Sequence, residues 1–361
     1  MGTLSYKCPG CGGPLKWDAS KQQYSCEYCL SGYTEEELKR LTPQKENYRD
    51  VTEEEAEAMN AAGGKAEASG KVRLYQCPSC GAQIVTDETT AASSCYYCHT
   101  PVVMEDRLKG ISAPDKVIPF TIDKAKAETI FKNWLGKRKY APKGFFDPGR
   151  IDGMTGVYFP YWIYNAQVHG QAQGTGEKDR VWTSGSERYT ETSVFRIDKS
   201  GDMPVSNLSR LALNKASRVL CESVAPFDYE KMRPFSNGYL SGFFAECRDV
   251  EKSTIETDVR DEVRSYAANM LRNNLQAGYT RVRLTNVRTE ITKEHWEYVL
   301  MPVWTVTYKD RDGKIYYFSV NGSTGKTVGE LPVDKGRLAL LFAKIFVPVF
   351  AVLMVILYFL G

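Results

Sequence analysis

The sequence predicts an α+β protein: two small zinc ribbons, a mostly antiparallel α+β domain and one C-terminal transmembrane helix. Three observations lead to this fold class. A four-cysteine pattern occurs twice in the first hundred residues, aromatic and β-branched runs alternate with amphipathic stretches in the middle, and an apolar segment closes the sequence. With 361 residues, the chain is long enough for roughly two or three modest domains.

Eight of the ten cysteines form two copies of one pattern. The first copy is Cys8, Cys11, Cys26 and Cys29, and the second is Cys77, Cys80, Cys95 and Cys98. In each copy two residues separate the members of a pair and fourteen separate the pairs. Each pair can direct two thiolates at one ion, and two pairs complete a tetrahedral four-sulfur site. We therefore expect two zinc ribbons, ribbon 1 (1–33) and ribbon 2 (72–104), with one Zn²⁺ in each.

Other uses of these cysteines are less well supported. Disulfides are disfavoured by the cytosolic placement argued below, and a redox-active cysteine pair would need a βαβ setting. Iron in the same four-sulfur geometry stays open, because spacing alone does not distinguish it from zinc. We interpret His99, next to Cys98, as a bystander, and the isolated Cys221 and Cys247 as buried or free thiols.

The segment from Leu338 to Leu360 is apolar except for Lys344. As a helix it would be about 35 Å long, enough to cross a hydrocarbon core of roughly 30 Å. Core helices of soluble proteins are rarely apolar all round over this length. Lys335, Arg337 and Lys344 lie toward its N-terminal side, so the positive-inside rule places the preceding residues in the cytoplasm. The sequence predicts a tail-anchored, single-pass protein of the cell membrane.

Two connecting segments are expected around ribbon 2. Residues 34–71 are acidic and poor in large apolar residues, which predicts a flexible linker that is helical at Thr34–Leu41 and Thr52–Ala62. We expect this linker to let the ribbons move relative to each other. Residues 105–150 are interpreted as a strand–helix connector with an amphipathic helix at Asp123–Lys137.

The α+β domain is assigned to residues 151–334. Its expected strands are Gly156–Tyr164, Val181–Thr183, Arg188–Ile197, Thr280–Thr292, Glu294–Lys309 and Ile315–Val320, with a hairpin turn at Asp310–Gly313. Helices are expected at Leu208–Val219 and Ser253–Leu275. The second has a predicted apolar stripe of Ile255, Val259, Val263, Tyr266, Met270 and Leu271.

The residues do not form a recognisable catalytic constellation. Gly322–Thr327 reads GSTGKT, but a phosphate-binding loop needs a glycine at the position of Val320, so a glycine-rich hairpin turn is favoured. The three histidines are scattered. We therefore expect a non-enzymatic adaptor or scaffold. A net charge of +3 gives little attraction for nucleic acid, so a membrane-tethered nucleic-acid-binding protein is kept as the alternative.

Four stretches carry a resemblance to a known family: CPSCGAQIVTDETTAASSCYYCHTPVV with PDKVIPF, then GVYFPYWIY, PFSNGYLSGFFAE, and YVLMPVWTVTY with YYFSVNGSTGKTVGELP. In this order they resemble bacterial tail-anchored membrane proteins described as TFIIB-type zinc ribbon-containing, some with a primosomal helicase-like label. The resemblance covers most of residues 77–332. It implies zinc ligands at Cys77, Cys80, Cys95 and Cys98.

The resemblance also implies a role. Some members of that family are similar to a zinc-ribbon component of a membrane-stress system, encoded near PspA-like, TPM-domain and SPFH-domain proteins. Recruitment of a partner protein to the membrane, of SPFH-domain or TPM-domain type, is the function this implies. The helicase label gains no support, because the sequence lacks the nucleotide-binding loop that a motor needs.

Overall fold

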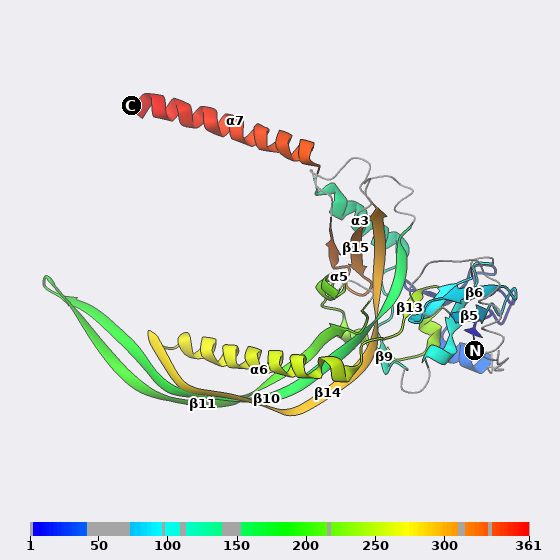
Figure 1. Ribbon diagram of the computed structural model, residues 1–361, viewed down its shortest axis with the longest axis horizontal. Coiled ribbons are helices and arrows are strands. Elements are labelled where there is room, and N and C mark those ends of the chain that lie inside the picture. The colour runs from blue at the N-terminus through cyan, green and yellow to red at the C-terminus, as the bar shows by residue number, and fades with distance from the viewer. Residues whose placement is uncertain are drawn as a thin grey trace. The chain divides into compact units, whose positions relative to one another are not determined.

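The computed structural model describes residues 3–41, 73–95, 98–108, 113–138, 153–214, 218–309, 315–330 and 334–360 (Figure 1). The fold is α+β with mostly antiparallel pairing, as predicted. The chain divides into two compact units. The first contains 1–159, 215–247 and 300–361, and the second contains 160–214 and 248–299. The segment expected as one α+β domain, 151–334, contributes to both.

Each cysteine pattern lies among short antiparallel strands of the first unit: those of ribbon 1 form a separate three-stranded sheet, and those of ribbon 2 are divided between a two-stranded sheet and the large sheet of the protein. In ribbon 1 the strands are β2 (Leu15–Asp18), β3 (Gln23–Cys26) and β4 (Gly32–Tyr33). In ribbon 2 they are β5 (Arg73–Gln76) with β6 (Gln83–Thr86), and β7 (Thr90–Ser94) with β8 (Pro101–Met104), followed by the 3-10 helix η1 (Glu105–Leu108).

Helix α1 (Glu35–Leu41) begins directly after ribbon 1, where the sequence predicts it. The Thr34 hydroxyl accepts a hydrogen bond from the Glu37 N–H (3.3 Å), and the Glu37 carboxylate accepts one from the Thr34 N–H (2.8 Å). This capping box satisfies two backbone donors at the helix start. The second expected helix, Thr52–Ala62, lies outside the described residues.

A short ladder joins the two ribbons, a contact that the expected flexible linker did not predict, and their relative motion stays a prediction. β1 (Thr3–Leu4) runs antiparallel to β8, with Thr3 opposite Met104. The Thr3 hydroxyl also donates a hydrogen bond to the Gln76 carbonyl at 2.8 Å. A ladder fixes the register of its two strands. With only two residues, β1 is too short to show a strand period in the sequence.

The rest of the first unit is built around a cluster of aromatic rings. The Phe120 ring stacks on Phe243 at 4.2 Å between centroids and contacts Tyr158 and Trp304, each at 5.0 Å. The Trp304 indole donates a hydrogen bond to the Ile122 carbonyl at 2.8 Å. The surrounding elements are β9 (Lys116–Val117), α3 (Lys124–Gly136), α5 (Arg218–Ser223), η4 (Tyr229–Lys231), β12 (Arg233–Pro234), η5 (Asn237–Leu240), β13 (Phe244–Glu246), β15 (Ile315–Asn321) and β16 (Thr327–Gly329).

Helix α3 confirms the amphipathic helix predicted at Asp123–Lys137. The Asp123 carboxylate accepts a hydrogen bond from the Lys126 N–H at 2.7 Å, which caps the N-terminus. Phe131 packs on Phe318 of β15, with ring centroids 4.5 Å apart. The turn between β15 and β16 is the hairpin expected at GSTGKT. The buried Asn321 side chain accepts from the N–H groups of Ser323 and Thr324, which fills the loop.

Three long strands dominate the second unit: β10 (Thr155–Ser184), β11 (Glu187–Leu211) and β14 (Arg281–Lys309). β10 and β14 also continue into the first unit, whereas β11 lies wholly in the second. β10 and β11 form an antiparallel hairpin, visible as the two green strands in Figure 1. The short strands expected at 156–164 and 181–183 are therefore parts of one strand. The segments expected at 280–292 and 294–309 are likewise both in β14. The turn expected at Asp310–Gly313 lies outside the described residues, although Lys309 pairs with Ile315 as that hairpin requires.

The helix expected at Leu208–Val219 is wrong. β11 continues through Leu211, with Leu208 opposite Tyr164 and Leu211 opposite Tyr161. α5 begins only at Arg218. The apolar residues in this stretch suggested a helical period, but pairing with β10 satisfies their backbone groups and overrides that local preference.

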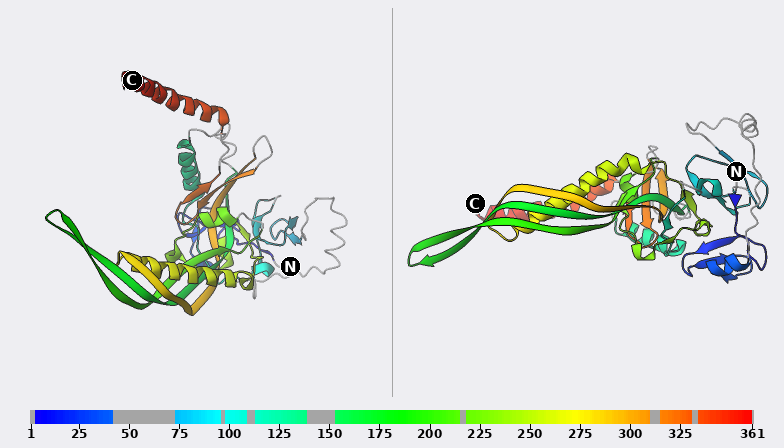
Figure 2. Two further views of the ribbon diagram at one scale, coloured as in Figure 1. Left: turned by 60° about the vertical axis from the view of Figure 1, so that its left-hand side comes forward. Right: turned by 90° about the horizontal axis from the view of Figure 1, so that it is seen from below.

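Helix α6 (Lys252–Gln276) lies along the long strands (Figure 2) and confirms the predicted helix. Its buried side is only partly the predicted stripe. The buried residues follow a four-residue step: Val259, Val263, Ala267, Leu271 and Leu275. Tyr266 and Met270 were expected in the stripe, but they are 60% and 41% exposed. Ala267 and Leu275 replace them because the small Ala267 fits against the Tyr164–Val168 stretch of β10.

Helix α7 (Lys335–Leu360) is long and apolar enough to cross a membrane. Its most apolar window, Leu338–Ile356, has a mean hydropathy of 2.6 and no part of it is buried in the protein. Lys335 and Arg337 fall in the first turn. Phe342, Phe346 and Phe350 stack at four-residue spacing, with centroids 5.2 and 5.5 Å apart.

Adjacent substitutions in α6 test its orientation. Leu271→Ala should lower the free energy of unfolding by about 2–4 kcal/mol, because it removes a buried side chain that packs on Gly170. Met270→Ala should change it by less than about 1 kcal/mol, because its side chain is partly in solvent. Urea denaturation of the detergent-solubilised protein, followed by tryptophan fluorescence, measures both. Equal effects would contradict this orientation of α6.

Candidate metal centres

The eight patterned cysteines come together as two four-sulfur groups, as the sequence predicts. Within each group, the four Sγ atoms all lie within 4.8 Å of one another. The shortest separations are 3.5 Å for Cys8–Cys29, 3.4 Å for Cys11–Cys26, 3.6 Å for Cys77–Cys98 and 3.7 Å for Cys80–Cys95. Zinc–sulfur bonds of about 2.3 Å in a tetrahedron require sulfur separations of roughly 3.8 Å. A disulfide requires about 2.05 Å, so these distances fit a shared ion and not disulfides.

Four backbone turns of the same form aim these cysteines. In each turn the first cysteine donates its N–H to the carbonyl five residues later, and its own carbonyl accepts from the N–H four residues later. The distances are 2.7 and 2.9 Å at Cys8, 3.0 and 2.9 Å at Cys26, 2.8 and 2.9 Å at Cys77, and 2.9 and 2.9 Å at Cys95. The backbone thus preforms each pair of ligands.

The residue after each second cysteine adopts a left-handed conformation. Gly12 and Gly81 have φ values of +74°, as expected for the glycine that follows CPxC. The equivalent positions in the second turns are Leu30 (φ +61°) and His99 (φ +56°). His99 therefore has a backbone role in its turn, and the four-sulfur group is complete without its imidazole. This agrees with its interpretation as a bystander.

Sequence reasoning missed a hydroxyl beside the fourth cysteine of each ribbon. The Ser31 Oγ lies 3.4 Å from the Cys29 Sγ, and the Thr100 Oγ1 lies 3.2 Å from the Cys98 Sγ. The pKa of each of these cysteines is lowered to about 6: the hydroxyl contact is the largest cause, and hydrogen bonds from the backbone N–H of the same residue and from other thiols of the group add to it. The signal was present in the sequence, because a hydroxyl residue stands two positions after the last cysteine in both copies.

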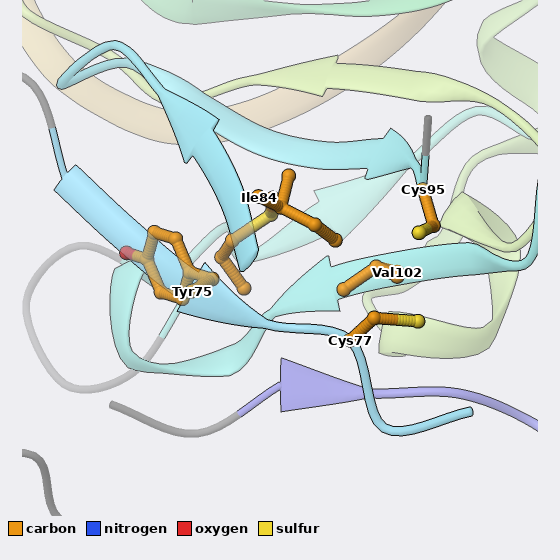
Figure 3. Close-up of a cluster of buried hydrophobic side chains, with 6 residues drawn as sticks. Tyr75, Cys77, Ile84, Cys95 and Val102 are labelled. Atoms are coloured by element: carbon orange, nitrogen blue, oxygen red, sulfur yellow. The ribbon is translucent and has the colours of Figure 1, made fainter. Parts of the chain in front are cut away.

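The second metal centre sits beside a small apolar core, shown in Figure 3. Tyr75, Ile84, Val102 and Met104 are buried together with the inner cysteines Cys77 and Cys95. The outer cysteines of both ribbons, Cys11, Cys29, Cys80 and Cys98, are exposed. Each group therefore faces the ribbon core on one side and solvent on the other.

Ribbon 1 packs on a loop far away in the sequence. The backbone N–H of Trp17 donates a hydrogen bond to the Ser241 carbonyl at 3.0 Å, and the Ser241 hydroxyl donates one to the Leu15 carbonyl at 2.6 Å. Trp17 also contacts Tyr239, with ring centroids 4.8 Å apart. Gly238 is required here, because a Cβ at that position would lie 2.0 Å from the Tyr24 hydroxyl. The PFSNGYLSGFFAE stretch thus holds the first metal centre against its unit.

The remaining cysteines lie outside both centres. Cys221 and Cys247 are each 7% exposed, which agrees with their interpretation as buried thiols. Burial raises the pKa of the Cys221 thiol to about 12.

A polar cluster around Glu294, in the segment 294–297 (EHWE), joins elements of the second unit. Glu294 accepts hydrogen bonds from Arg260 (2.6 and 3.0 Å) and from the Tyr164 hydroxyl (3.0 Å), so it links α6 to β10 and β14.

Comparison with known proteins gives one curated relative over nearly the whole chain. A Bacillus subtilis (strain 168) protein described as "Uncharacterized protein YdjG" is 29% identical over 342 residues, which cover 95% of this chain and 94% of that protein. No protein-family model matches the chain. No solved structure matches it.

Metal content tests the two centres directly. We expect two ions per chain in protein purified without chelator, one ion in the Cys77→Ser/Cys80→Ser variant, and two in the Cys221→Ala control. Elemental analysis by inductively coupled plasma mass spectrometry gives the count. Two ions retained in the double variant, or fewer than two in the control, would show that the ligands are assigned wrongly.

Acidification tests the hydroxyl at Ser31. A metal ligand must be a thiolate, so metal leaves as pH falls through the range in which the cysteines become protonated. Ser31→Ala removes the group that holds the pKa of Cys29 near 6, so ribbon 1 should release its ion at a higher pH than in the wild type. A chromogenic chelator follows release, and ribbon 2 serves as the internal control. An unchanged release profile would rule out this role for the hydroxyl.

Proposed function

We propose that this chain is a non-enzymatic, membrane-anchored adaptor that holds two Zn²⁺ ions and recruits a partner protein to the cytoplasmic face of the cell membrane. The observation that carries the proposal is the pair of four-sulfur centres, built from identical turns and joined by the β1–β8 ladder. Such a construction presents two small surfaces in a fixed arrangement, which suits binding rather than chemistry.

The donor set supports structural zinc. Four thiolates complete a tetrahedral zinc site, whereas catalytic zinc keeps a position open for water or substrate. When bound, the ion supplies folding free energy to segments that are too small to fold on their own apolar burial. The protein positions the thiolates through the backbone turns and stabilises them through the Ser31 and Thr100 hydroxyls.

Helix α7 supports the membrane location. With Lys335 and Arg337 in its first turn, it fits a membrane anchor whose preceding residues face the cytoplasm. Cytosolic thiols stay reduced, which keeps the cysteines available for metal. A partner of SPFH-domain or TPM-domain type, and a role in membrane stress, follow from the family resemblance of the second ribbon and the sequences after it.

Affinity purification from gently solubilised membranes tests the proposal. We expect a partner protein in stoichiometric amount with the wild-type chain, and its loss from the Cys77→Ser/Cys80→Ser variant while that variant remains in the membrane fraction. The Cys221→Ala variant, with both centres intact, should retain the partner. Mass spectrometry and nuclease digestion identify what is bound.

Two results would overturn the proposal. Partner retained at wild-type level by the double variant would show that the ribbons do not recruit it. Recovery of nucleic acid that salt removes, in place of protein, would favour a membrane-tethered nucleic-acid-binding protein.

A further inference from the structure

The second turn of ribbon 1 carries two large apolar side chains in solvent. Tyr28 and Leu30 flank the metal ligand Cys29, and their exposed fractions are 76% and 84%. Leu30 is the most exposed large apolar side chain among the residues that the structure describes. The edge of the Tyr28 ring lies over Gly13, where a Cβ would approach it to 2.9 Å. The two side chains therefore project from a turn that the metal centre holds in place.

Leucine is an unfavourable choice at this position. Leu30 has a φ of +61°, a region in which a Cβ crowds the backbone and glycine is preferred. The equivalent position in the two first turns is a glycine, Gly12 or Gly81. The chain thus keeps a strained leucine where glycine would fold more easily, and strain of this kind marks functional positions.

The other described non-glycine residues with positive φ have reasons within the fold or the residue type. The Gln22 side chain donates hydrogen bonds to the carbonyls of Ala19 (2.6 Å) and Phe120 (2.8 Å), which ties ribbon 1 to its unit. Asn207 and His99 belong to residue types that are enriched in this region, whereas leucine does not. Leu30 instead exposes an apolar side chain to solvent. A contact with another molecule would therefore account for leucine at this position.

Charge narrows the kind of surface that Leu30 meets. From Glu27 to Glu37 the sequence carries four carboxylates, at Glu27 and at Glu35–Glu37, and no lysine or arginine. Lys16 pairs with Glu27 at 2.8 Å and offsets its charge, so the net acidic charge of this stretch lies in the first turn of α1, at Glu35–Glu37. Like charges repel across an interface, so this acidic border disfavours the phosphates of a bilayer or a nucleic acid and favours a basic protein surface.

We propose that Tyr28 and Leu30 insert together into an apolar pocket of a partner protein, and that lysine or arginine residues on the rim of that pocket face the acidic first turn of α1. This inference rests on the proposed adaptor function and names the contact that ribbon 1 makes. Tyrosine is enriched among the residues that dominate the free energy of binding, and interfaces commonly place such an aromatic side chain in a pocket with a polar rim.

The test separates binding from folding with substitutions at matched positions. Leu30→Gly removes the contact and also relieves the backbone strain. It should therefore keep both metal ions and release zinc to a chelator no faster than the wild type. Recovery of the partner identified by the purification above should fall by at least about tenfold. Tyr28→Ser should lower recovery similarly without touching the left-handed position.

His99→Gly is the control, because His99 holds the equivalent left-handed position in ribbon 2. It should leave partner recovery within about twofold of the wild type. Raising the salt concentration should weaken binding to the wild-type chain, because the border contacts are ionic.

The inference is overturned if Leu30→Gly and Tyr28→Ser, with two metal ions bound, retain the partner at wild-type level. It is also overturned if a photoreactive residue at position 30 forms adducts with lipid or nucleic acid and not with that partner. In either case the adaptor proposal survives if the Cys77→Ser/Cys80→Ser variant loses the partner. If the wild-type chain recovers no stoichiometric protein, the adaptor function fails and this inference fails with it.

Discussion

The convergence of four sulfur atoms on one point is the constraint on which the first unit depends. Neither ribbon has many buried apolar residues, and small segments of this kind need metal to remain folded. Neighbouring strands are tied to this geometry: β1 before the first cysteine pairs with β8 after the last, and β7 of ribbon 2 pairs with β13. Loss of the ions would therefore disturb strands that contain no metal ligand.

Features set by local chemistry could be predicted from the sequence. The cysteine spacing predicted the two four-sulfur groups, and the helical period after Asp123 predicted α3. These predictions succeed because each depends on residues close together in the chain. The glycine-rich turn at GSTGKT succeeded for the same reason, since the missing glycine at Val320 is a local fact.

Features set by distant partners could not be predicted. Leu208–Leu211 form a strand because β10 lies beside them, and α6 buries Ala267 rather than Tyr266 because β10 offers a close surface there. Ribbon 1 is held by Ser241 and Tyr239, more than two hundred residues later in the sequence. The left-handed conformation of Leu30 could likewise be recognised only from its backbone angles, because the sequence shows only that this position is not a glycine.

X-ray absorption spectroscopy of the purified full-length chain tests the central claim most directly. The account predicts a zinc edge and a first shell of four sulfur atoms at about 2.3 Å, averaged over two ions in like surroundings. An iron edge would contradict the assignment of zinc. A shell that contains nitrogen or oxygen, or cysteines oxidised to disulfides with no metal, would contradict the four-thiolate centres themselves.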